Sequence, residues 1–134
     1  MGNYVQIKAA GLGLTWYDTP AMSPYSGRNR TVLINDASMF RYYFRGTLPA
    51  VDFTRCSVIA TQFYSTYVLS GDSQYIAKYP IINGNGILMD IRDNYTGAGL
   101  CAITHPTVMI IIPKVPNGTP INTRIQKGQQ AIYF

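Results

Sequence analysis

The sequence contains no glutamate, only one histidine and two cysteines, and just 13% of its 134 residues are charged. So little charge, with no glutamate, excludes a coiled coil, a long solvated helix or an acidic disordered tail. The histidine and cysteines together are too few for a structural zinc site, which needs four such ligands. No apolar run approaches the ~18 residues of a spanning helix. We therefore expect neither a metal site nor a transmembrane segment.

The eleven basic residues are scattered, and the net charge of +5 results from having only six acidic residues. A nucleic-acid-binding tail would show a run of five or more like charges, and this sequence has none. The glycine clusters at 11–13 and 83–86 lack the spacing and the following helix of a phosphate-binding loop. The sequence therefore predicts no cofactor and no nucleic acid, and it favours another protein or self-association.

Eleven tyrosines, twelve glycines and eight prolines are typical of strands joined by tight turns. Polar and apolar residues alternate in 86–92 (GILMDIR) and 120–125 (PINTRI), as expected for strands with one wet face. The segment 107–112 (TVMIII) has no polar alternation, so it predicts a central strand covered on both faces. The length fits one domain spanning 1–134. We predict a mainly β domain, either an antiparallel β-sandwich or a partly closed barrel.

One short helix is predicted over residues 36–45. Asn35 and Asp36 offer capping oxygens at its start, and Gly46 supplies a stop. Its apolar stripe consists of Met39, Phe40, Tyr43 and Phe44. After the helix, Asp52 is expected to cap backbone donors of a turn.

Chemistry-bearing residues are few. A small hydrolase would have to use Cys101, His105 and an Asp, but CAITHP reads as extended, which separates positions four apart by ~13 Å. We therefore predict no catalytic residues and keep the hydrolase as an alternative. Arg41 and Arg45, one turn apart on the predicted helix, would suit a phosphate or carboxylate, although a solvated helix face is the commonplace interpretation.

The two cysteines lie 45 positions apart. A Cys56–Cys101 bridge would close a long loop and stabilise an exported protein, and two buried thiols are the alternative. We predict the disulfide if the protein is exported. The start of the sequence shows no basic region followed by an apolar core, so we expect a signal peptide to be either absent or already removed.

The stretch PYSGRNRTVLINDASMFRYYFRGTLPAVDFTRCSVIA resembles the PrcB-like domain, named for an accessory subunit of a bacterial surface protease complex. The residues in the family's places are Ser26, Gly27, 32–34, 40–44 and 48–53. Further on, ITHPTVMIIIPKVP is similar to the family's late strand in lipoprotein relatives from Bacteroidetes-type bacteria. The resemblance implies a non-enzymatic, exported and often lipid-anchored β domain that supports another protein at the cell surface or in the periplasm.

A domain that lacks catalytic residues is expected to bind its partner through tyrosine side chains and strand edges. Tyrosine provides contact area at small entropic cost. Packing of these rings in the protein's own core is the alternative. The segment 129–134 is predicted to pair as an added strand, in its own sheet more readily than by exchange. A self-assembling filament or virion subunit is an alternative class of function for this sequence. The predicted contact residues are Tyr64, Tyr67, Tyr75, Tyr79, Ile132, Tyr133 and Phe134.

Overall fold

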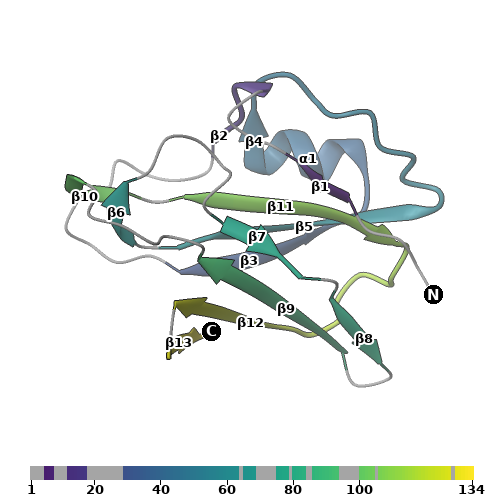
Figure 1. Ribbon diagram of the computed structural model, residues 1–134. Helices are drawn as coiled ribbons and strands as arrows, with labels where there is room; N and C mark the ends of the chain where they lie inside the picture. Colours follow the sequence, from purple (N-terminus) through teal and green to yellow (C-terminus); the bar gives the residue numbers. More distant parts are fainter. Residues whose placement is uncertain are drawn as a thin grey trace.

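Two packed β-sheets with a short helix on the outer side of one of them make up the fold (Figure 1). The computed structural model describes residues 5–7, 12–17, 29–63, 65–68, 75–78, 80–83, 86–93, 100–104, 106–127 and 129–134, with side chains omitted at 65–68, 83, 100–104, 127 and 130. Its described strands form a sandwich and no closed barrel. The predicted mainly β architecture with one helix is confirmed.

Sheet 1 is antiparallel throughout, in the order β1-β11-β5-β3. On the central strand β11, Val108, Ile110 and Ile112 point toward the second sheet. The alternate residues Met109 and Ile111 pack on the helix side. This strand is covered on both faces, as the apolar run predicted. The strand bounds are β1 (Val5–Ile7), β3 (Arg30–Ile34), β5 (Cys56–Gln62) and β11 (Thr107–Pro113).

Sheet 2 has the order β13-β12-β9-β7, with β8 also pairing β9. Its strands are β7 (Tyr75–Ala77), β8 (Ile81–Asn83), β9 (Gly86–Asp93), β12 (Ile121–Lys127) and β13 (Gln130–Tyr133). Strands β9 and β12 pair in parallel, which departs from the antiparallel prediction. The reason is topological: after β9 the chain runs back along β11 and re-enters sheet 2 at the end where β9 began. Strand β13 pairs antiparallel with β12, so the prediction of an added C-terminal strand in the chain's own sheet is confirmed.

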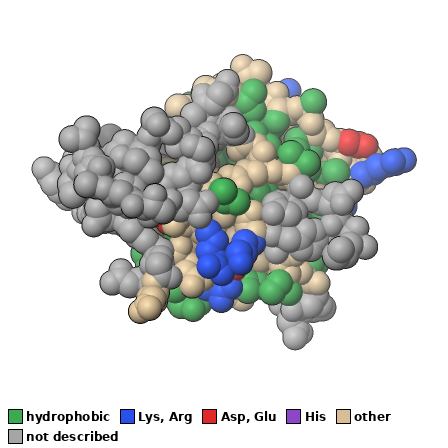
Figure 2. All heavy atoms as spheres, viewed as in Figure 1, with side chains coloured by type: hydrophobic (Ala, Val, Ile, Leu, Met, Phe, Trp, Pro, Cys, Tyr) green, Lys and Arg blue, Asp and Glu red, His purple; other side chains and the backbone are tan. Residues whose placement is uncertain are grey.

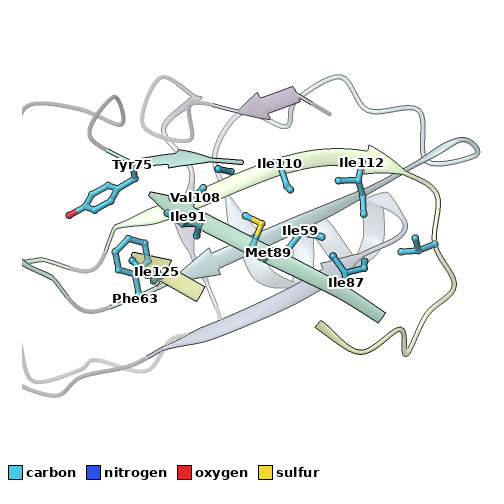
Figure 3. Packing of buried hydrophobic residues seen from close by; sticks show 12 residues of the cluster. Ile59, Phe63, Tyr75, Ile87, Met89, Ile91, Val108, Ile110, Ile112 and Ile125 are labelled. Atoms are coloured by element: carbon cyan, nitrogen blue, oxygen red, sulfur yellow. The ribbon is translucent and has the colours of Figure 1, made fainter. Parts of the chain in front are cut away.

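The core between the sheets is apolar and closely packed, with Met89 and Ile91 of β9 facing Ile59 and Ile110 of sheet 1 (Figure 3). Polar contacts join the sheets at both margins. The Thr31 hydroxyl on β3 lies 2.6 Å from the Thr123 hydroxyl on β12 and 3.0 Å from that of Thr61.

At the opposite margin the side-chain amide of Gln6 on β1 contacts the backbone of β7. Its Nε2 donates to the carbonyl of Tyr75 at 2.8 Å, and its Oε1 accepts from the amide of Ala77 at 2.9 Å. The Gln6 side chain thereby makes the two hydrogen bonds with β7 that a peptide group of a neighbouring strand would make.

Helix α1 (Ala37–Tyr43) is shorter than the predicted 36–45. Asp36 caps it as expected, accepting from the amide of Met39 at 2.7 Å. The helix stops at Tyr43 because Phe44 turns extended, and its ring packs 4.3 Å from that of Trp16. A tertiary contact, and not Gly46, therefore ends the helix. Two short strands pair at this point, β2 (Thr15–Trp16) and β4 (Phe44–Arg45).

A further strand pair lies at one end of the sandwich. Strands β6 (Ser65–Val68) and β10 (Leu100–Thr104) are antiparallel, with Cys101 opposite Tyr67. In Figure 1 they lie at the left, beyond the end of β5, whereas Cys56 begins β5 at its other end. Strand β5 is ~20 Å long, and a disulfide requires Cα atoms within ~7 Å. The Cys56 thiol is free, so the predicted bridge is not formed in this structure.

Candidate binding face

The residues predicted for partner contact are separated by the structure. Tyr64 and Tyr79 lie outside the described residues, as does His105 of the hydrolase alternative, and only the backbone is described for Tyr67 and Cys101. Tyr75 is 6% exposed and packs edge-on against Phe63, with ring centroids 5.0 Å apart. Its position on β7 points Tyr75 into the core, which is the alternative that the sequence left open for these rings.

The C-terminal residues differ in their exposure. Tyr133 pairs with Arg124 and is 70% exposed, and Ile132 is 49% exposed. Phe134 exchanges two backbone hydrogen bonds with Thr123, and its ring packs against the core. Phe134 is thus partly buried, whereas Ile132 and Tyr133 are accessible to a partner.

The predicted arginine pair on the helix does not form. Arg45 lies beyond the helix end, where its NH1 donates to the carbonyls of Arg41 and Phe44. Its guanidinium also stacks 3.4 Å from the ring centroid of Tyr17. Arg45 thus caps the helix C-terminus, a role that cations fill well, and it is not aligned with Arg41 toward a ligand.

Polar residues meet where β3 and β11 end and β5 begins, beside a hollow of about 490 Å³. Asn35 donates to the Val115 carbonyl at 3.0 Å and to Oδ1 of Asn117 at 2.7 Å, and it accepts from the Ser57 hydroxyl. The Lys114 ammonium donates to the carbonyls of Asn35 and Phe53. These groups bond one another, so the cluster stabilises the fold and leaves little free for a ligand.

The outer face of sheet 2 brings distant residues together in register. We use this name for the side chains that point away from the core on β7, β8, β9, β12 and β13. Pairing places Arg124 beside Asp90 and Tyr133, while Arg92 lies beside Ile76. The face comprises Ile76, Lys78, Ile81, Leu88, Asp90, Arg92, Asn122, Arg124, Gln126, Ala131 and Tyr133.

Charge is concentrated in the middle of this face. Arg124 binds Asp90 with two hydrogen bonds, 3.2 Å from Nε to Oδ1 and 2.6 Å from NH2 to Oδ2. These bonds hold the pKa of the Asp90 carboxyl below its ordinary value, with burial opposing them and with Arg92 and Lys78 adding to the lowering. The same pair raises the Arg124 pKa. Figure 2 shows Lys and Arg side chains gathered over the region of β9.

Arg92 and Lys78 form no ion pair within the described residues, although both lie near enough to Asp90 to lower its pKa. Arg92 is half-buried, and its Nε is enclosed yet has no hydrogen-bond partner within the described part of the chain. Lys78 is exposed and donates its backbone amide to the Asp90 carbonyl at 2.7 Å. Around them lie Ile76 and Ile81, which are 47% and 56% exposed. The outer face thus combines uncompensated positive charge with an apolar rim.

This grouping could not be located from the sequence. The alternation in 86–92 and 120–125 showed that Arg92 and Arg124 face outward, but only the parallel pairing of β9 with β12 places them on adjacent strands. Among the described side chains, no group of three or more His, Cys, Asp or Glu residues is arranged to hold a metal ion. No helix of the described segments is long and apolar enough to cross a membrane.

Comparisons with known proteins found no matching family model, no matching curated protein and no matching solved structure. The resemblance to the PrcB-like domain therefore stays a prediction.

Replacing Asp90 with asparagine is expected to make the free energy of unfolding less dependent on pH in the acid range. Because the folded pKa of Asp90 is lowered, the ion pair contributes fully above the unfolded pKa of ~3.9. Its contribution is lost as the pH falls through the folded value. Urea unfolding at several pH values between about 5 and 2 should show a steeper loss for the wild type than for Asp90→Asn. Parallel profiles would contradict a stabilising role of this pair.

Proposed function

We propose that this chain is a non-enzymatic binding domain that supports another protein, and that the outer face of sheet 2 is its docking surface. The observation that carries the proposal is the composition of that face, in which Arg92 and Lys78 lie among exposed isoleucines and Tyr133. Arginine, tyrosine and aliphatic side chains at the centre of a patch are typical of protein interfaces. Their attachment to paired strands holds them in fixed positions, which reduces the entropy lost on binding.

A finer form of the proposal follows from the resemblance to the PrcB-like domain. It makes the chain an exported accessory subunit of a surface or periplasmic protein complex, attached to the membrane by a lipid anchor. The resemblance alone supports this compartment. Immunoblotting of the cytoplasmic, periplasmic and membrane fractions of native cells checks it, and recovery in the cytoplasmic fraction alone would contradict it.

Site-specific photocrosslinking tests the docking surface. Benzoylphenylalanine placed at Ile81, on the outer face, is expected to yield one dominant covalent adduct in native cells. The matched control is the same group at Tyr42 on α1, which has a similar exposed fraction, 63% against 56% for Ile81. Introducing Ile76→Asp elsewhere on the same face should abolish the adduct, since a charge there disrupts the apolar rim. Equal labelling from both positions, or none from Ile81, would refute the proposal.

A further inference from the structure

We infer that the partner segment received by the outer face of sheet 2 is acidic, with carboxylates that bind Arg92 and Lys78 and apolar residues that contact Ile76 and Ile81. This inference rests on the proposed function and specifies the chemistry of the partner. It concerns a protein segment carrying several Asp or Glu residues in a mainly extended stretch.

Arg92 is the anchor of this interaction. A guanidinium has five donors in a planar fork, and a carboxylate accepts two of them side by side. Arg92 is only half-buried, so a partner carboxylate reaches its guanidinium from the outer face, whereas its enclosed Nε lies beneath that surface.

Arg124 has a different role in the same cluster. It is committed to Asp90 by two hydrogen bonds, and the Asp90 side chain is only 10% exposed. The pair is internally neutral and fixes the centre of the face. Lys78 and Arg92 are then the two cations on the face that form no ion pair within the described residues, and they attract a segment of opposite charge.

Two other occupants fit this face less well. A second copy of the chain would place the same cations against each other, and like charges across an interface oppose association. An anionic membrane would meet the Asp90 carboxylate as well as the cations, and stable membrane attachment uses clusters of four to eight basic residues. An acidic protein segment matches both the charges and the apolar rim.

The probe for this inference is a fluorescein-labelled peptide of about eight alternating aspartate and valine residues, whose extended form is favoured by valine. Fluorescence anisotropy is expected to show saturable binding that weakens between about 50 mM and about 300 mM salt, as screened charge interactions do. The same peptide with asparagine in place of aspartate should not bind. No saturable binding of the acidic peptide would overturn the inference.

Matched variants locate the interaction. The double change Arg92→Gln with Lys78→Gln is expected to weaken peptide binding by at least about tenfold. Arg41→Gln with Arg55→Gln removes the same charge from exposed positions off this face and should leave the affinity within about twofold. Thermal unfolding of both double variants verifies that they fold. Equal weakening in the two would show non-specific attraction and overturn the inference.

The remaining outcomes are separated by two measurements. Sedimentation with vesicles of about 30% phosphatidylserine would contradict the inference if the chain bound them and not the peptide. Light scattering that showed a dimer broken by Arg92→Gln with Lys78→Gln would assign the face to a second copy and also overturn it. A specific adduct from Ile81 without peptide binding would leave the proposed function standing and reject only the acidic partner.

Discussion

The Gly86→Ala variant is expected to lose about 3 kcal/mol of unfolding free energy, from backbone strain and overpacking together. Gly86 begins β9 with φ of +135°, a conformation that residues with a Cβ rarely adopt. A Cβ added there would lie 2.5 Å from the carbonyl oxygen of Pro120, which is backbone and cannot move aside easily. That carbonyl also accepts from the amide of Ile87, so the strain reaches the point where β9 and β12 come together.

Gly118 provides the matched control. Its φ is +81°, but a Cβ there would have nothing within 4 Å. Gly118→Ala should therefore lower the free energy of unfolding through backbone strain only, by about 1 kcal/mol. Urea unfolding of both variants measures the difference, and equal losses would show that the approach of Pro120 to Gly86 is not limiting.

The Asn35→Ala variant is expected to destabilise the fold by about 3 kcal/mol, since it removes three hydrogen bonds of a largely buried polar cluster. The Val115 carbonyl and the Asn117 amide oxygen would lose a donor, and the Ser57 hydroxyl would lose an acceptor. Asn35 itself is 6% exposed, so water would not readily replace these bonds.

Asn122→Ala is the control for this change. Asn122 is an exposed asparagine on β12, and its loss should alter the unfolding free energy by less than about 0.5 kcal/mol. Guanidinium unfolding monitored by the fluorescence of Trp16 compares the variants. A similarly small effect at both positions would mean that the polar cluster does not stabilise the sandwich.

Local pattern was sufficient to predict much of the fold. The apolar run of β11, the alternation of β9 and β12 and the Asp36 cap all appear where expected, because each depends on residues close in sequence. Asp52 likewise caps its turn, accepting from the amide of Thr54 at 3.1 Å. These are features that burial on one face or a local hydrogen bond dictates.

Features that depend on distant partners were not predicted. Phe44 continues the helical stripe in sequence, yet its contact with Trp16 draws it into an extended strand. The sequence left open whether Tyr75 faces a partner or the core, and the pairing of β7 with β9 turns it inward. The outer face exists only because β12 crosses to lie parallel to β9, a choice that the order of the whole chain determines.

The Gln6 amide has a consequence for aggregation. By bonding the outward carbonyl of Tyr75 and the outward amide of Ala77, it satisfies the edge of β7 that would otherwise template a foreign strand. Within the described strands, the free edges of sheet 2 are then β13 and the three-residue β8. An edge as short as β8 offers few backbone groups, so a foreign strand is directed to β13. Two copies that pair through β13 each occupy the other's edge, so strand addition there ends at a pair.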